Sequence, residues 1–375
     1  MLPTLQESDL QSWKLLDQFR QRLKPFLESE PPPLAADPRR QVLAEDYFCL
    51  LLFGLFNPAL KSMNALCHAS GRFAKMRQVC SRPIAKGSFS EGQHVFEPAV
   101  LAGVLRPLAC EAKGRAEFGD ERVRQAVQAL TLVDGTVLRA LHRMASAPAS
   151  SRGCAIKLHL PFSVFDQLPE DWTITPGNVC ERKTWKRKAQ PGTCYVSDRL
   201  YSKDYRFMTV MQERGIDFVL RLNNNAVRTP LGPARPLTLE DRAAGVVSDR
   251  QERLGQSEDG PVVRVVEIQA TGKTFLLVTS RLDLPAEIVG LIYRYRWQIE
   301  VFFKWFKMIL GCRHWLAESP RGVALQLYGA LIATLLLMLL TKTRPTKRQM
   351  EALHLYFVGF ATEDELLRAL GLQKS

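Results

Sequence analysis

Residues 125–222 carry the pattern that most restricts how this chain can fold. Short apolar runs and segments of helical periodicity alternate there, separated by turn residues. In chain order they predict three strands (130–133, 155–165 and 171–179), a helix (181–189), a strand that ends at Asp198, a helix (203–215) and a strand (217–222). This order indicates an α/β unit built on a mixed sheet.

The segments on either side differ in character. Residues 1–120 are mostly helical in pattern, with a loop rich in Gly and Ser at 81–92 and a helix that Pro98 opens. Further on, residues 262–268 and 274–280 predict a β-hairpin. We therefore expect a helical N-terminal domain (1–120), the first half of an α/β core (125–225), a small β insertion (226–285), the second half of the core (286–342) and a helical tail (343–375).

The charge balance favours a polyanionic partner. The 375 residues include 51 Lys and Arg against 38 Asp and Glu, a formal net charge of +13. The excess is spread over segments that otherwise have the pattern of folded structure, so it is not a basic tail. Nucleic acid and an anionic membrane are the two partners that such an excess favours.

Residues 323–340 bear on the membrane alternative. These eighteen positions contain no charge, which is the lower limit of length for a spanning helix, but Gln326, Gly329 and Thr334 dilute their apolar character. A buried core helix is the favoured interpretation. The N-terminus lacks the layout of a signal peptide, and the eight cysteines show neither C-x-x-C spacing nor a zinc pattern. We therefore expect a cytoplasmic protein with reduced thiols and no membrane partner.

A stripe of charged residues lies on the long helix predicted from about Ala286. At 100° per residue, a face roughly 80° wide carries Tyr293, Arg296, Glu300, Lys304 and Lys307. The opposite face is apolar and comprises Ile299, Phe302, Phe306 and Leu310. One interpretation is a solvated surface with pairs such as Arg296–Glu300, each worth only about 0.2–0.5 kcal/mol. The other is a carboxylate that binds a metal ion at a phosphodiester, between basic side chains that hold phosphates.

Two further carboxylates could join Glu300, and a site for two metal ions needs more than one. Asp134 in LVDGT and Asp198 in YVSDR each stand at the end of a predicted strand, from which the side chains could project toward a common point. Each residue also has an ordinary alternative. Asp134 could form an Asp-Gly hairpin turn, and Asp198 could be a capping or loop residue.

At these residues the sequence resembles a known family. Tyr293, Arg296, Glu300 and Lys307 have the spacing of the Y-R-E-K signature of bacterial insertion-sequence DDE transposases, above all the group founded on insertion sequence four. The VDGT and SDR segments resemble the two aspartate motifs of that family, and a β insertion before the glutamate is also typical of it. The resemblance covers about residues 80–340. The Y-R-E-K spacing is specific, whereas VDGT alone is a weak signal.

The resemblance implies an RNase H-like catalytic core in which Asp134, Asp198 and Glu300 hold two Mg²⁺ ions, with Mn²⁺ as a substitute. It implies a transposase that cuts and joins double-stranded DNA, at the terminal inverted repeats of a mobile element and in target DNA, as a homodimer in the bacterial cytoplasm and nucleoid. In this interpretation Tyr293, Arg296 and Lys307 would grip DNA phosphates, and Lys304 on the same helix stripe is a further candidate DNA contact. An RNase H-like nuclease without strand transfer and a catalytically inactive DNA-binding relic remain as alternatives.

Some members of that family stack a flipped base on a Trp of the β insertion, but no Trp lies between residues 199 and 296 here. Trp297, on the predicted glutamate helix, is an aromatic ring that could serve instead, which leaves a hairpin route of cleavage in doubt.

Two other segments bear on function. ERKTWKRK at 181–188 interleaves Trp185 with basic residues, which suits a DNA backbone, although a solvated helix face would look the same. Its basic residues are Arg182, Lys183, Lys186, Arg187 and Lys188. In KLHL, Lys157 and His159 share one strand face, and we expect His159 to be structural rather than a ligand.

Overall fold

The computed structural model describes residues 14–29, 42–57, 59–60, 62–114, 119–139, 155–186, 188–310, 316–317, 319–341 and 346–372. The chain divides into two compact units. One comprises residues 1–116, 138–156 and 303–375, and the other comprises residues 117–137 and 157–302.

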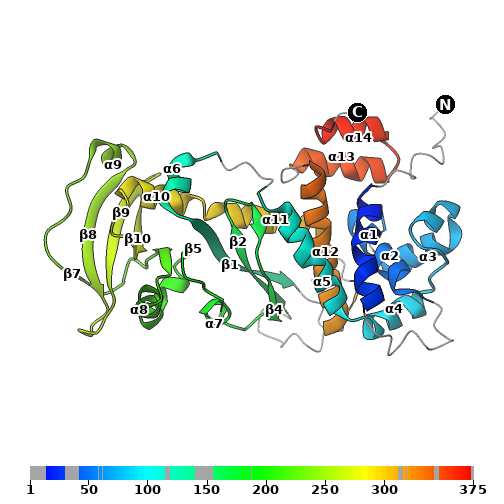
Figure 1. Ribbon diagram of the computed structural model, residues 1–375, viewed down its shortest axis with the longest axis horizontal. Helices are drawn as coiled ribbons and strands as arrows, with labels where there is room; N and C mark the ends of the chain where they lie inside the picture. Colours follow the sequence, from blue (N-terminus) through cyan, green and yellow to red (C-terminus); the bar gives the residue numbers. More distant parts are fainter. Residues whose placement is uncertain are drawn as a thin grey trace. The chain divides into compact units, whose positions relative to one another are not determined.

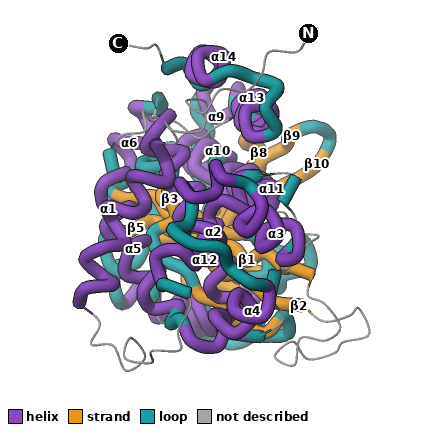
Figure 2. Tube along the Cα trace, turned by 90° about the vertical axis from the view of Figure 1, so that its right-hand side faces the viewer, coloured by secondary structure: helices purple, strands orange, loops and turns teal. Residues whose placement is uncertain are grey.

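The first unit is helical. Its helices are α1 (Lys14–Ser29), α2 (Ala44–Phe56), α3 (Met63–Arg72), the 3₁₀ helix η2 (Ala74–Gln78), α4 (Lys86–Val95), α5 (Pro98–Ala112), α12 (Pro320–Thr341), α13 (Lys347–Phe357) and α14 (Glu363–Ala369). α12 packs against α1, α2, α4 and α5, of which Figure 1 shows α1, α2 and α5 around it. α13 and α14 pack on each other (Figure 2). Pro98 opens α5, as the sequence predicts.

Within the described residues, α12 is the one helix that is long and apolar enough to cross a membrane. In this structure 83% of its most apolar window is buried. The four helices packed around it supply that burial, which is the environment expected of a core helix.

α4 shows where composition misled the prediction. The expected loop over 81–92 is wrong for residues 86–92, which are helical. Tertiary packing outweighs the weak helix propensity of the Gly and Ser residues there. Phe89 is fully buried, and its ring centre lies 4.7 Å from that of Tyr47. Gly92 permits this close packing, because a Cβ at that position would stand 2.7 Å from the Tyr47 ring.

The second unit is built on one mixed sheet. Its described strands are β1 (Ala129–Arg139), β2 (Ala155–Ser163), β3 (Leu168–Pro169), β4 (Thr173–Pro176), β5 (Thr193–Ser197), β6 (Asp217–Arg221), β7 (Arg228–Pro230), β8 (Val246–Leu254), β9 (Val262–Ala270) and β10 (Lys273–Thr279). They pair in the order β3-β2-β1-β5-β6-β10-β9-β8-β7, and β4 pairs with β2. The helices here are α6 (Glu121–Ala126), α7 (Glu181–Lys186), η3 (Tyr201–Lys203), α8 (Tyr205–Glu213), α9 (Leu239–Ala243), α10 (Ala286–Arg294) and the start of α11 (Trp297–Leu310).

The first five strands of that order have RNase H-like topology. β1 is parallel to β5, and β5 is parallel to β6, with α8 in the crossover between them. β2 runs the opposite way, since Val164 N, just past its end, donates a hydrogen bond to Leu130 O near the start of β1. The predicted α/β core with a mixed sheet is therefore confirmed.

The β insertion continues this sheet. β10 pairs antiparallel with β6, with Val278 opposite Leu220, and β9, β8 and β7 follow in turn (Figure 1). A single hydrophobic cluster contains Val133 of β1 together with Leu254 and Val263 of the insertion. The hairpin β9–β10 was predicted, whereas β7 and β8 were missed. The insertion thus shares its hydrophobic core with the strands that carry the predicted aspartates.

Candidate active site

Asp134 and Asp198 lie on neighbouring parallel strands, Asp134 within β1 and Asp198 just past the end of β5. β1 and β5 pair as far as Leu132 and Val196, and each aspartate follows two residues later. Asp198 is the first residue after β5, as predicted, and its Oδ1 accepts a hydrogen bond from Leu200 N at 2.8 Å. The prediction that Asp134 stands at a strand end is wrong, and Asp134 does not form a hairpin turn either, because β1 continues past it to Arg139. The sheet therefore brings two of the predicted acids together.

The acids crowd one another. The pKa of Asp134 is raised to about 7, chiefly because the side chain is buried. The Gly135 N–H, which donates to Asp134 Oδ1 at 2.7 Å, lowers this pKa, as does Arg296. The negative charges of Glu181 and Asp198 raise it. Because its acids are only partly neutralised, this cluster has the electrostatic character that favours binding of a divalent cation.

Glu300 is linked to the cluster through Arg296. It stands in the first turn of α11, and its Oε1 lies 2.7 Å from Nη1 of Arg296. The charge of Asp134 also acts on Arg296, whose guanidinium carbon is 5.9 Å from the centre of the Tyr293 ring. Arg296 is therefore the residue that connects Glu300, Asp134 and Tyr293.

The carboxylates fit a hard divalent ion by their chemistry, since Mg²⁺ prefers oxygen ligands. Among the described residues, however, no three Asp, Glu, His or Cys side chains are close enough to share one ion. Glu300 is paired with a guanidinium, which neutralises it in the way that a metal ion would. The carboxylates are thus suitable ligands for such an ion, and the third of them, Glu300, is paired with Arg296.

The long helix predicted to carry the charged stripe is in fact two helices. α10 ends at Arg294, and α11 begins at Trp297. Between them, Arg296 N bonds Tyr293 O at 3.0 Å and Gln298 N bonds Tyr295 O at 2.8 Å, which is the spacing of a 3₁₀ turn. The prediction that Tyr293 shares one continuous helical face with Arg296 and Glu300 is therefore wrong. Tertiary contacts favour the break, since the Tyr295 hydroxyl donates to Asp120 at 3.3 Å.

α11 otherwise has the predicted faces. Its apolar face is buried and comprises Ile299, Phe302, Phe306 and Leu310. Lys304 is exposed and Lys307 is half-buried. Trp297 is 62% exposed, which leaves its ring available to a partner.

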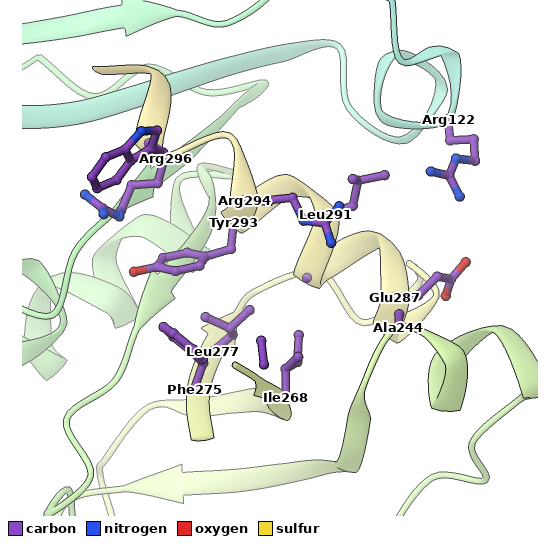
Figure 3. Close-up of a pocket in the computed structure, with 13 residues that line it drawn as sticks. Arg122, Ala244, Ile268, Phe275, Leu277, Glu287, Leu291, Tyr293, Arg294 and Arg296 are labelled. Carbon is purple, nitrogen blue, oxygen red and sulfur yellow. The ribbon is translucent and has the colours of Figure 1, made fainter. Parts of the chain in front are cut away.

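A cavity of about 330 Å³ lies beside the end of α10 (Figure 3). Phe275 and Leu277 of β10 form one side of it, Tyr293 lies above them, and Arg122 approaches from α6. Arg296 lines the cavity as well, so one guanidinium borders both the acids and this space. Aromatic rings beside basic side chains suit a nucleic-acid base and its phosphate.

The basic segment 181–188 is less open than its composition indicates. Trp185 is 4% exposed and packs edge-on against Tyr201, so it belongs to the core. Lys188 Nζ is bound to the carboxylate of Asp171 and to Thr173 Oγ1. Arg182 is half-buried. The side chains of Lys183 and Lys186, and the whole of Arg187, lie outside the described residues.

His159 is a structural residue, as expected. Its Nε2 lies 2.7 Å from Thr175 Oγ1 in the neighbouring strand β4. Burial, together with the nearby ammonium groups of Lys157 and Lys188, lowers its pKa to about 4. The ring is therefore neutral at physiological pH.

Glu181 is the acidic neighbour that the sequence did not indicate. It opens α7, is buried, and lies 3.1 Å from Lys157 Nζ. Its charge acts on Asp134. The sequence Glu-Arg-Lys indicates only a charged start of a helix. The contact with Lys157, 24 residues earlier in the chain, becomes visible only in the folded structure.

Comparison with known proteins agrees with this geometry. Residues 126–336, more than half of the chain, match the family described as the transposase DDE domain. The chain belongs to the DDE transposases. Members of this family are enzymes that cut and join DNA strands in transposition with divalent metal ions. The resemblance seen in the signature residues is thereby confirmed.

Three relatives are named as transposases. The protein y4zB of Sinorhizobium fredii is 30% identical over 277 residues, which span 69% of this chain and 76% of the relative. The protein of insertion sequence element IS5377 from Geobacillus stearothermophilus is 28% identical over 213 residues, 56% of this chain and 55% of that one. The protein of element IS4SA from Synechocystis is 29% identical over 152 residues, 39% of this chain and 40% of its own length.

Proposed function

We propose that this transposase cuts DNA at the terminal inverted repeats of the element that encodes it and joins the ends to target DNA, by a cut-and-paste route. In this proposal Asp134, Asp198 and Glu300 hold two Mg²⁺ ions. The observation that carries it is the placement of Asp134 and Asp198 two residues beyond the last paired residues of the parallel strands β1 and β5, with Glu300 paired to Arg296, on which the charge of Asp134 also acts.

The ions would supply activation of water or of a DNA 3′-hydroxyl and stabilisation of the leaving oxygen. The chain supplies rigid placement. Asp134 lies within β1 and Asp198 directly after β5, so the sheet holds both carboxylates more accurately than a flexible loop would. Arg296 has a planar fork that matches carboxylate and phosphate equally well, so it could exchange Glu300 for a DNA phosphate.

The cavity beside α10 extends the proposal to the DNA next to the cut. Tyr293, Arg296 and the exposed Trp297 line it, and we assign them to the nucleotides that flank the scissile phosphate. Lys304 and Lys307 would contact the backbone further along α11. Stacking on an aromatic ring contributes about 1–3 kcal/mol per base.

Residues 1–120 would recognise the element ends. Arg72, Arg82 and Lys86 are exposed around α3 and α4, and Phe73 beside them is 57% exposed. A basic surface with an exposed ring is suited to a DNA backbone. We further propose that the protein acts as a homodimer on DNA of the bacterial nucleoid, in the cytoplasm.

The deciding experiment incubates the purified wild type, Asp134→Asn and Glu300→Gln proteins with Mg²⁺ and a duplex that carries the repeats flanking the gene. We expect the wild type alone to cut at the repeat boundary, while all three bind the duplex equally well. A duplex of scrambled sequence is the control for specificity. Cleavage by Glu300→Gln would show that the metal assignment is wrong.

A target plasmid separates a transposase from a nuclease with the same core. Insertion of labelled ends into the plasmid is the expected product. Cutting without insertion would instead support a nuclease. Specific binding without cutting by the wild type would support a DNA-binding relic.

A further inference from the structure

Glu181 is a buried carboxylate with two defined partners. It is the first residue of α7, and its Oε1 lies 3.1 Å from Lys157 Nζ. Its Oε2 accepts a hydrogen bond from the hydroxyl of Tyr201 at 3.2 Å. Tyr201 is 2% exposed and the side chain of Lys157 is 13% exposed. A carboxylate removed from water to this extent needs such partners to remain charged.

The same carboxylate lies close beside Gly135, the residue that follows Asp134. A Cβ added to Gly135 would stand 2.8 Å from Glu181 Cδ and 3.0 Å from its Oε1. Gly135 is therefore required for space, since its backbone is not among the described positive-φ conformations. The Gly135 N–H in turn donates to Asp134 Oδ1 at 2.7 Å. Glu181 thus lies against the residue whose N–H orients Asp134.

We infer that Glu181, held by Lys157 and Tyr201, is a positioning residue that orients Asp134 for the divalent metal ions of the transposase. It fixes the Asp134–Gly135 peptide by contact and adds a fourth negative charge behind the three predicted ligands. This inference rests on the proposed metal site. Among the charges that act on Asp134, that of Glu181 exceeds that of Asp198, in agreement with this close placement.

A purely structural ion pair would behave differently. Its loss would lower thermal stability and leave metal binding unchanged. Loss of a residue that orients a metal ligand typically costs about 10–100-fold in metal affinity or activity. Metal affinity is therefore the measurement that separates the two roles.

The test compares Glu181→Gln with the wild type on the same end DNA. Free Mn²⁺ is measured by electron paramagnetic resonance during titration of the protein–DNA complex, and the Mg²⁺ concentration for half-maximal cleavage is measured in parallel. We expect both affinities to fall by about tenfold. End binding without divalent metal should be unchanged. The double variant Lys157→Met/Glu181→Gln leaves no unpaired buried charge, and it serves where Glu181→Gln alone does not fold.

Two controls make the result decisive. Glu252→Gln alters another buried carboxylate, which pairs with Arg228 at 3.3 Å in the insertion, and it should lower the melting temperature with no effect on metal affinity. Asp134→Asn should abolish metal-dependent cleavage. Wild-type metal affinity in Glu181→Gln, together with loss of metal binding in Asp134→Asn, would overturn this inference alone. Wild-type metal binding by Asp134→Asn would overturn the proposed site itself.

A second variant tests the contact between Glu181 and Gly135 by changing Gly135 instead. Gly135→Ala would displace the Glu181 carboxylate without removing its charge, so we expect weaker Mn²⁺ binding and slower cleavage with intact end binding. Unchanged Mn²⁺ binding by a folded Gly135→Ala protein would contradict the positioning role.

Discussion

The β insertion and the acidic cluster of Asp134, Asp198, Glu181 and Glu300 both hold charged side chains partly or fully removed from water, but they neutralise those charges to different extents. In the insertion, the Arg264 guanidinium is 2% exposed and makes two hydrogen bonds to Asp249, at 2.8 and 2.6 Å. It also donates to Leu284 O at 2.5 Å. Arg264 and Asp249 thus neutralise each other in the interior.

The acidic cluster has a surplus of one sign instead. Asp134, Asp198, Glu181 and Glu300 share Arg296 and Lys157 as the cations placed among them. The difference teaches that burial alone does not mark a functional site. A neutralised buried pair serves to hold strands in place, whereas an acidic cluster that the protein leaves incompletely neutralised is prepared for a cation from outside.

Breaking the neutralised pair should have the largest effect on stability. Arg264→Met leaves Asp249 buried without its partner, which costs about 3–5 kcal/mol of unfolding free energy. Urea denaturation measures this cost. The double variant Asp249→Leu/Arg264→Met should recover most of the loss, and a double variant as unstable as the single one would show that the charges are not the cause.

Removing a carboxylate from the acidic cluster should instead raise the stability of the protein. The raised pKa of Asp134 means that, between about pH 4 and pH 7, the folded state holds a proton that the unfolded state has lost, so stability falls as the pH rises through this window. Asp134→Asn removes that dependence. At pH 8, without divalent metal, the variant should be more stable by on the order of 2 kcal/mol.

The check for Asp134→Asn is a series of denaturation curves from pH 4 to pH 8 in a chelating buffer, beside a cleavage assay with Mg²⁺. We expect a gain in stability at high pH and complete loss of cleavage in one protein. A variant less stable than the wild type at pH 8 would contradict the surplus of negative charge in the cluster.

Arg296→Ala should act mainly on DNA. In the proposed role Arg296 contacts one phosphate, so its loss should weaken end binding and make the dependence of log K on log salt shallower by about 0.9. Binding measured over a salt series gives this slope, and Arg250→Ala in the insertion is a matched control. An unchanged slope in Arg296→Ala would count against the phosphate role.

The smallest effect is expected where the insertion meets α10. The Asp241 carboxylate accepts hydrogen bonds from Thr238 N at 3.0 Å and from Glu287 N at 2.9 Å, and so caps α9 and the first turn of α10 together. Asp241→Ala should cost about 1 kcal/mol of stability. It should also slow cleavage a few-fold, since α10 leads into the turn that carries Arg296. Equal cleavage rates at equal folded fraction would limit Asp241 to a structural role.

The sequence was sufficient to predict the parts of the site that depend on strand order and on helical periodicity. Asp134 and Asp198 each follow an apolar run, and these runs pair as neighbouring parallel strands, so the closeness of the two acids could be predicted although β1 continues past Asp134. The apolar face of α11 could be predicted as well, because Phe302 and Phe306 recur at helical spacing. These features depend on local periodicity and on a simple topological rule.

What escaped prediction depends on contacts between distant residues. The break after Arg294 is invisible to periodicity, because the segments on both sides favour a helix. β8 was missed because Asp249 and Glu252 resemble loop residues until Arg264 and Arg228 are placed beside them. Glu181 was hidden in a basic run, since nothing in its neighbours in sequence indicates Lys157. In each case the partner lies at least fifteen residues away or requires the fold to be known.

The single hydrophobic cluster that contains Val133, Leu254 and Val263 also limits how this enzyme can diversify. An insertion that folded as a separate module could be exchanged between relatives as a cassette, carrying its own DNA preferences with it. Here a transplanted insertion would also have to reproduce the packing beneath the strand of Asp134. New specificities should therefore arise by stepwise substitution at exposed positions such as Val227 and Val247, rather than by recombination of whole segments.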